Sequence, residues 1–213
     1  MADIFQEIEE DLKRERVEVL WKKYGNWVIG AAVAVVAVTA GIQGWGSYQK
    51  SVQSEKSVIF AAAFELSEAG KTDEAHSKLV SLADKDDGYG TLARFEQARI
   101  LSDKGDKAAA IKIWDDIAES NPPIQKLKDV ASLLSAMHLV EEGDVADVKL
   151  RLAKLSVAGA PFRYSAIELQ ALVALREGDN AAARTFFQQL ADDTETPNGI
   201  RGRAAQILES LAE

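Results

Sequence analysis

Residues 171–190 read ALVALREGDNAAARTFFQQL, and the spacing within this stretch decides the fold. Gly178 and Asp179 separate two runs of residues that favour helices. Ala171 comes seven positions before the glycine, and Ala183 comes five positions after it. Large apolar residues follow at helical spacing. The pattern predicts two helices joined by a tight turn.

The same arrangement occurs three more times in the chain. The turn glycines are Gly70, Gly105, Gly143 and Gly178, at steps of 35, 38 and 35 residues. The small residues seven positions before them are Ala63, Ala98, Ala136 and Ala171, and the residues five positions after them are Ala75, Ala110, Val148 and Ala183. Large apolar residues stand nine positions after each glycine (Leu79, Trp114, Leu152, Phe187) and twelve positions after it (Leu82, Ile117, Leu155, Leu190).

This period predicts an all-α fold, a solenoid of about four helix pairs. A glycine adopts the positive φ that ends the first helix of a pair, and the aspartate near it caps the second. Small residues let the paired backbones approach each other, and the large residues fill the space against the next pair. Residues 200–211 predict one more amphipathic helix, which we expect to cover the last pair.

The repeat resembles the tetratricopeptide repeat, a helix–turn–helix unit of about 34 residues. All four units match its small residue in the first helix, and three match its alanine in the second, with Val148 in the third unit. Its closing proline is matched by Pro122, with Pro161 and Pro197 displaced by about one residue. The large aromatic residue usual early in the first helix is absent from most units, so the resemblance implies degenerate repeats.

A second stretch, Trp27 to Tyr48, reads WVIGAAVAVVAVTAGIQGWGSY and contains no charged residue. As a helix it would extend roughly 33 Å, enough to cross a hydrocarbon core of about 30 Å. Tryptophan and tyrosine cluster at both ends, as expected at membrane interfaces. We therefore expect a single transmembrane helix at 24–48. A cleavable secretory signal fits less well, because the apolar run is too long and the segment before it carries mixed charge.

The flanking charges predict the orientation of this span. Five basic residues precede it closely, whereas only Lys50 and Lys56 follow it at a comparable distance. The positive-inside rule then keeps the N-terminus in the cytoplasm and sends the rest of the chain across the membrane. We expect three regions: an amphipathic cytoplasmic segment at 1–23, the span at 24–48 and a repeat domain at 49–213. The first segment either lies on the membrane, binds a partner or only sets the topology.

Composition excludes several functions. The chain has a formal net charge of −9, and residues 51–213 hold 19 Lys and Arg against 27 Asp and Glu, a net charge of −8. Such a domain is a poor binder of nucleic acid, because phosphate contacts need clustered basic residues. There is no cysteine, which excludes disulfides, thiolate zinc sites and iron–sulfur clusters.

The residues offer little for catalysis or metal binding. His76 and His138 lie in separate predicted helices, and Glu142, four positions after His138, is what chance supplies in so charged a chain. The acidic stretch at 84–88 does not fit a calcium loop, because the sixth and twelfth positions from its start are a tyrosine and a phenylalanine. We expect no enzyme activity, cofactor, metal or small-molecule substrate. The alternative is an enzyme whose site the sequence does not disclose.

Solenoids of paired helices bind partners on the concave face formed by their first helices. Helical projection predicts a protein-binding groove lined by Phe60, Phe64, Phe95, Arg99, Leu133, Met137, Val140, Glu168 and Leu172. This set is mostly apolar, so the groove would bind a hydrophobic segment of a partner by side-chain burial. The alternative is that neighbouring helices cover these residues as core.

The whole layout is also similar to the bacterial ancillary SecYEG translocon subunit family. The similarity is architectural: a short charged N-terminus, one span and an acidic repeat domain of this size. It implies a scaffold in the inner membrane with its repeat domain in the periplasm. Its partners would be translocon subunits, periplasmic chaperones and exported chains. An accessory subunit of another inner-membrane complex is the alternative.

Overall fold

The structure is a computed structural model of the full chain. It describes the backbone of residues 2–85, 87–120, 124 and 126–211, and the side chains at these positions except 2–20 and 25–33. The chain divides into two compact units, Met1–Glu55 and Lys56–Glu213.

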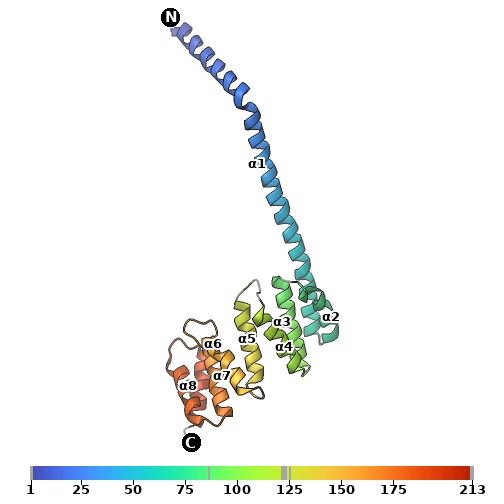
Figure 1. The fold of residues 1–213 in the computed structure, drawn as a ribbon, viewed down its shortest axis with the longest axis vertical. Coiled ribbons are helices and arrows are strands. Elements are labelled where there is room, and N and C mark those ends of the chain that lie inside the picture. Colours follow the sequence, from blue (N-terminus) through green and yellow to red (C-terminus); the bar gives the residue numbers. More distant parts are fainter. Residues whose placement is uncertain (1, 86, 121–123, 125, 212–213) are drawn as a thin grey trace. The chain divides into compact units, whose positions relative to one another are not determined.

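The secondary structure of the described residues consists of nine α-helices, and no strand occurs among them (Figure 1). The all-α prediction is confirmed. The helices are α1 (Ala2–Glu68), α2 (Thr72–Ala83), α3 (Gly88–Asp103), α4 (Lys107–Glu119), α5 (Lys126–Leu139), α6 (Val145–Leu155), α7 (Arg163–Arg176), α8 (Asn180–Asp192) and α9 (Asn198–Ser210).

The core of the second unit is a series of four apolar clusters. Each cluster draws its buried side chains from three successive helices: α1 to α3, α3 to α5, α5 to α7, and α7 to α9. All sixteen residues at the four repeat positions are buried, and the largest exposed fraction among them is 4%, at Leu155. The repeat pattern therefore identified the buried face of every helix pair.

The predicted glycine turns are confirmed in three of the four pairs. Gly70, Gly105 and Gly178 have φ of 77°, 88° and 77°. Gly143 has no such conformation, so the prediction is wrong there. A Cβ on Gly143 would lie 2.7 Å from both the Cβ and the carbonyl oxygen of Leu139, so this glycine allows a close approach instead.

The predicted aspartate caps are also confirmed in three pairs. Asp106, Asp144 and Asp179 each accept a hydrogen bond from the backbone N–H three residues later. In the first pair, Lys71 occupies the cap position of α2 without a side-chain bond, and Asp73 lies inside the first turn. The prediction of an aspartate cap is wrong for this pair, because two residues rather than none separate its glycine and aspartate.

Helix α9 covers the last pair, as predicted. Ala204 is buried against α7 and α8, and Ile200, Ile207 and Leu208 pack around it. Of the prolines that match the repeat motif, Pro197 occupies the cap position of α9, and Pro122 lies outside the described residues.

The first unit consists of one helix. Helix α1 is uninterrupted from Ala2 to Glu68. Neither proline nor glycine occurs from Ser47 to Ala69, so the sequence lets the helix continue through this segment. In the part of the chain whose side chains are described, no helix is both long and apolar enough to cross a membrane. The predicted span at 24–48 includes residues 25–33, whose side chains lie outside that part, and so do the side chains of residues 1–20 in the predicted segment at 1–23. The span and its orientation stay predictions.

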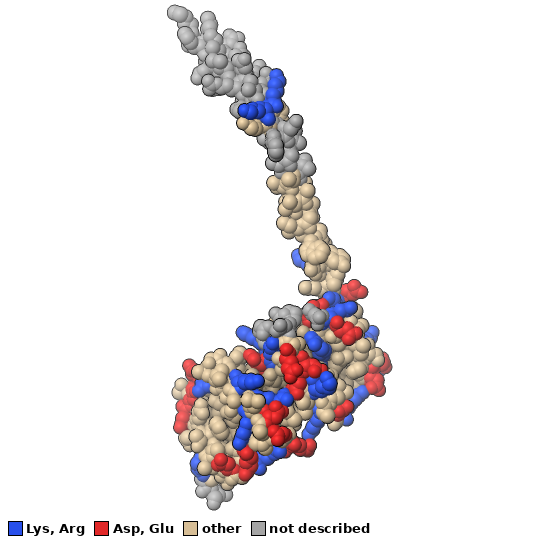
Figure 2. All heavy atoms as spheres, viewed as in Figure 1, with Lys and Arg blue, Asp and Glu red and all other residues tan. Residues whose placement is uncertain are grey.

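Acidic and basic side chains are interspersed on the visible face of the second unit (Figure 2). Ion pairs link successive helix pairs at several points, among them Lys149 with Glu177 at 2.7 Å and Arg203 with Glu168 at 2.7 Å. The negative charge of this unit is therefore partly compensated at its surface.

Gly90 offers a test of helix packing at the start of α3. A Cβ at this position would lie 1.9 Å from the carbonyl oxygen of Lys85 and 2.9 Å from that of Leu82. We expect Gly90→Ala to lower the free energy of unfolding by about 2 kcal/mol, since backbone atoms have little room to move aside. Urea denaturation followed by circular dichroism measures the change.

Gly88→Ala is the matched control, because a Cβ there meets nothing within 4 Å in the same helix turn. This control should leave stability unchanged or slightly raised, as alanine favours the helix. Equal losses from the two variants would contradict the packing described for α3.

Candidate functional site

An apolar groove of about 500 Å³ lies between α1, α3 and α5, with α4 beneath it. One arginine, Arg99 on α3, stands among its lining residues. We call this site the apolar groove. It is lined by Phe60, Phe64, Leu92, Phe95, Glu96, Arg99, Ser102, Asp103, Trp114, Leu134, Met137 and His138.

Five of the nine predicted site residues line this groove: Phe60, Phe64, Phe95, Arg99 and Met137. Phe64 is 45% exposed and Met137 is 47% exposed, so neighbouring helices do not cover them as core. The structure thus brings together five of the predicted residues from α1, α3 and α5, the first helices of three successive pairs.

The other four predicted residues lie elsewhere. Val140 is buried in the cluster of α5 to α7, where Leu133 and Leu172 also pack. Glu168 is bound through both carboxylate oxygens to Arg203 of α9, at 2.7 and 2.8 Å. Val140 is thus covered as core, Leu133 and Leu172 are partly buried beside it, and Glu168 forms an ion pair at the surface.

Helix geometry explains the difference on α5. Leu134, Met137 and His138 follow one another at i, i+3 and i+4 and face the groove. Leu133 is turned by about 100° from Leu134 around the helix axis and packs in the next cluster, as does Val140, which follows the last residue of α5. The helical projection from the sequence therefore predicted Leu133 for the groove, whereas the next residue, Leu134, lines it.

Sequence reasoning missed several lining residues. Leu92, Leu134 and His138 belong to the groove, and the i, i+3 spacing of Leu92 and Phe95 could have indicated the first of them. Trp114 was predicted only as core. It is 3% exposed and forms the floor from α4.

Aromatic contacts hold this floor in place. The rings of Trp114 and His138 are stacked, with centroids 4.8 Å apart and planes inclined by 23°. His138 Nε2 lies 3.5 Å from the hydroxyl of Ser102 on α3. Burial lowers the pKa of His138, and the positive charge of Lys107 lowers it further, whereas Asp103 opposes the shift. His138 is therefore a neutral, apolar-facing side chain at neutral pH.

The polar end of the groove is organised by Arg99. Its guanidinium donates to both carboxylate oxygens of Glu96 at 2.6 and 2.9 Å, to Asp103 at 2.7 Å and to the hydroxyl of Ser67 at 2.7 Å. Glu96 is only 7% exposed, so its carboxylate lies inside the protein, whereas 42% of the Arg99 side chain stays exposed at the groove. Hydrogen bonding to Glu96 raises the pKa of Arg99, and burial opposes this effect.

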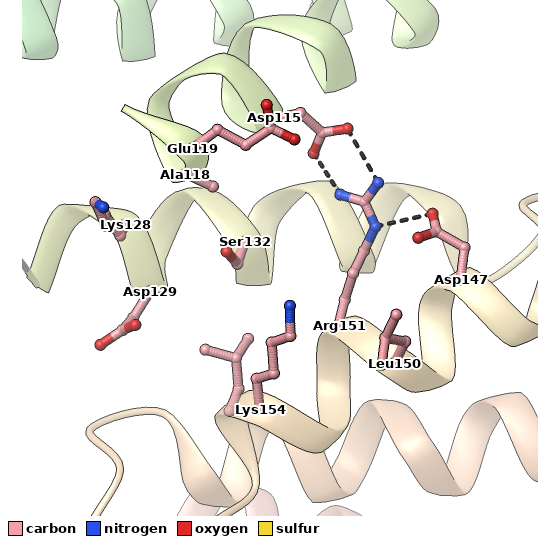
Figure 3. A pocket seen from close by; sticks show the side chains of 11 residues that line it. Asp115, Ala118, Glu119, Lys128, Asp129, Ser132, Asp147, Leu150, Arg151 and Lys154 are labelled. Atoms are coloured by element: carbon pink, nitrogen blue, oxygen red, sulfur yellow. Dashed lines mark hydrogen bonds and ion pairs between the residues drawn. The ribbon is translucent and has the colours of Figure 1, made fainter. Parts of the chain in front are cut away.

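A second, polar pocket of about 360 Å³ lies between α4, α5 and α6 (Figure 3). Arg151 extends from α6 to Asp115 on α4, and Lys154 points into the pocket. Its lining side chains are Asp115, Ala118, Glu119, Lys128, Asp129, Ser132, Asp147, Leu150, Arg151, Lys154 and Leu155.

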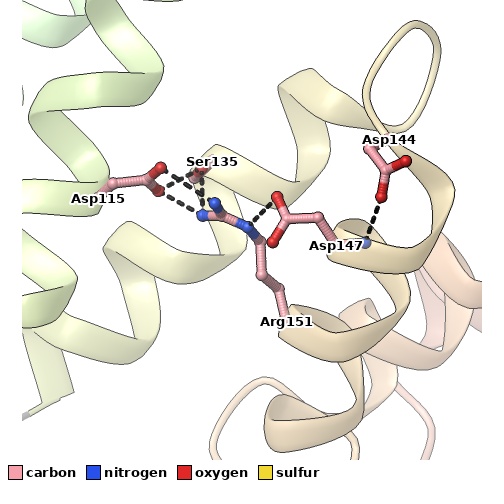
Figure 4. A network of polar contacts seen from close by, with 5 residues as sticks. All are labelled: Asp115, Ser135, Asp144, Asp147 and Arg151. Carbon is pink, nitrogen blue, oxygen red and sulfur yellow. Dashed lines mark hydrogen bonds and ion pairs between the residues drawn. The ribbon is translucent and has the colours of Figure 1, made fainter.

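Arg151 is the centre of a network that links three helices (Figure 4). It forms a two-pronged ion pair with Asp115, and it donates to Asp147 at 2.8 Å and to the hydroxyl of Ser135 at 3.0 Å. Ser135 in turn donates to Asp115 at 2.7 Å. The hydrogen bond to Asp115 raises the pKa of Arg151 against the effect of burial. Because these charges are compensated, we assign the network to joining helix pairs.

Comparison with known families identifies the repeat. Residues 19–212 match the family model of the tetratricopeptide repeat-like domain. The chain belongs to this family. Comparisons with curated proteins and with solved structures gave no match. Membership confirms the resemblance to tetratricopeptide repeats seen in the sequence.

The apolar groove lies on the side of the repeat domain that the sequence predicts as the binding face. Helices α1, α3 and α5 are the first helices of three successive pairs, and solenoids bind on the surface that these helices form. The polar pocket lies instead between two second helices, α4 and α6, and one first helix.

A double-mutant cycle on Asp115 and Arg151 tests the joining role of the network. We expect Asp115→Asn and Arg151→Met to show a coupling of about 1–2 kcal/mol in the free energy of unfolding, between the values of exposed and buried pairs. Lys112 and Asp116 are the matched control, since they form an exposed i, i+4 pair on α4. Their coupling should be clearly smaller. Equal couplings would contradict the assigned role.

The lowered pKa of His138 predicts a pH effect on stability. Below the usual pKa of 6.5, His138 takes up a proton more readily in the unfolded chain than in the folded chain. The contribution of neutral His138 to the free energy of unfolding is therefore full above pH 6.5 and is lost as the pH falls. We expect wild type to lose more stability than His138→Phe between about pH 7 and pH 5. Denaturation by urea at each pH measures both proteins. Parallel curves would contradict burial of a neutral histidine.

Proposed function

We propose that this protein is a non-catalytic, membrane-anchored scaffold that binds other proteins in the apolar groove. One observation carries the proposal: Phe64, Leu92 and Met137 are 45%, 40% and 47% exposed, and they lie together in one groove. Contiguous exposed apolar side chains are unfavourable in water and mark sites of interaction. Family membership supports the proposal, since solenoids of helix pairs use such surfaces to bind partners.

The anchor in this proposal is the segment at 24–48, with the N-terminus in the cytoplasm. It is supported by the uncharged stretch from Trp27 to Tyr48 and by the excess of basic residues before it. The repeat domain would then stand in the periplasm of a bacterial cell, attached to the inner membrane. The acidic charge of the domain does not favour contact with anionic lipid, so attachment depends on the anchor.

The partners in this proposal are translocon subunits, periplasmic chaperones or exported chains. They follow from the architectural similarity to the ancillary SecYEG subunits, and no residue of the groove selects among them. Purification of the full chain in mild detergent distinguishes these partners from another inner-membrane complex, which would make the protein an accessory subunit of that complex.

Site-directed crosslinking in living cells tests the groove. The chain has no native cysteine, so Phe64→Cys can carry a thiol-reactive photo-crosslinker without competing sites. We expect protein adducts from this position because it lies in the groove. Val80→Cys on α2 is the matched control, since Val80 is 44% exposed but does not line the groove. Equal capture from both positions would contradict a specific binding role.

The same two variants test the proposed topology. A membrane-impermeant maleimide added to spheroplasts should label both thiols, because the proposal puts α1's end and α2 outside the inner membrane. Labelling only after lysis would contradict the orientation but leave the crosslinking result intact.

A further inference from the structure

We infer that the apolar groove binds an internal segment of a partner chain in which apolar side chains stand beside a lysine or arginine, and that it does not bind a C-terminal carboxylate. The inference rests on the proposed function and specifies its ligand. It depends on the hydrogen bonds of Arg99 and on the carboxylates that surround it.

Arg99 is the only cationic side chain among the described residues that line the groove. A guanidinium has five N–H donors. Four donations are already made inside the protein, two to Glu96, one to Asp103 and one to Ser67. A bidentate grip on a carboxylate needs two parallel N–H groups. Arg99 therefore has too few free donors to hold the end of a chain.

Negative charge exceeds positive charge at this end of the groove. Glu96, Asp103 and Glu68 all act electrostatically on Arg99, and three carboxylates against one guanidinium leave a formal charge of −2. Asp103 has 58% of its side chain exposed, so its carboxylate can approach a cation of a partner. A basic side chain is thus complementary to this end, and an acidic one is repelled.

Two cations close in sequence to Asp103 form ion pairs with other carboxylates. Lys104, directly after α3, forms an ion pair with Asp73 of α2. The ammonium group of Lys107, whose charge lowers the pKa of His138, lies 3.9 Å from the carboxylate of Glu141. Neither cancels the excess of carboxylates around Arg99. The groove therefore has two parts: an end with excess negative charge around Arg99, and an apolar part whose described lining residues carry no charged side chain.

The apolar part of the groove favours large apolar side chains of a partner and does not require a particular sequence. Phe60, Phe64, Leu92 and Met137 offer aromatic and flexible surfaces, and methionine adapts to side chains of different shape. A volume of about 500 Å³ lies within the range of sites that enclose several groups of a ligand. Apolar burial supplies the affinity, and the acidic end supplies the preference for a neighbouring basic residue.

Peptide binding to the full chain in lipid nanodiscs tests the inference, with empty nanodiscs as the background. Two fluorescent peptides share one apolar core. Beside this core, one peptide carries two lysines and the other carries two glutamates. Each is made as a free acid and as a C-terminal amide. We expect the lysine peptide to bind about fivefold more tightly at low salt, as one or two exposed ion pairs provide. The ratio should shrink at high salt, because salt screens exposed charges. Acid and amide forms should bind equally.

Asp103→Ala is the decisive variant. It removes an exposed carboxylate and releases one N–H of Arg99, so the preference for lysine should fall and the free acid should bind more tightly than the amide. Glu74→Gln on α2 is the control, since this exposed carboxylate pairs with Lys71 and does not line the groove. It should change neither ratio.

The outcomes separate the inference from the proposed function. Equal affinity for the lysine and glutamate peptides, or tighter binding of free acids by wild type, overturns the inference but leaves the groove as a binding site. Absence of binding by every peptide, together with no difference between wild type and Phe64→Asp, overturns both. Tight binding of the lysine peptide that is lost in Phe64→Asp and weakened in Asp103→Ala supports both.

Discussion

No helix pair in the second unit can bury its own apolar face. Each of the four core clusters takes side chains from three successive helices, so every pair depends on the one that follows. This dependence explains why small and large residues recur at the same four positions in each unit. It also explains α9, since the last pair would otherwise expose the side of Phe187 and Leu190 that α9 covers.

Stacking of this kind determines where ligands can bind. The large residues of the second helices fill the core, and the first helices are left with one side facing outward. In α1, α3 and α5 that side carries aromatic, leucine and methionine side chains, which form the apolar groove. Trp114 connects the two roles, because it fills the core of α3 to α5 and also forms the floor of the groove.

The polar pocket and the apolar groove differ in how far their charged and apolar side chains are compensated within the fold. In the polar pocket, Arg151 is matched by Asp115 and Asp147, so the strongest charges there are compensated within the fold. In the apolar groove, Arg99 is also matched, but the apolar side chains stay exposed to water and carboxylates outnumber the cation. Hydrophobic burial and charge complementarity therefore favour the apolar groove as the place where a partner binds.

The sequence by itself determined the helix pairs, the buried positions and the capping helix, because each follows from local periodicity repeated four times. Its failures occurred where local geometry departs from the repeat, at Gly143 and at the start of α2. Only the tertiary structure decided which residues of different helix pairs converge. Arg99 meets Ser67 from 32 residues away, and Arg151 meets Asp115 from 36 residues away. Such contacts depend on the angle between successive helix pairs. Side-chain packing determines this angle, and no local sequence pattern specifies it.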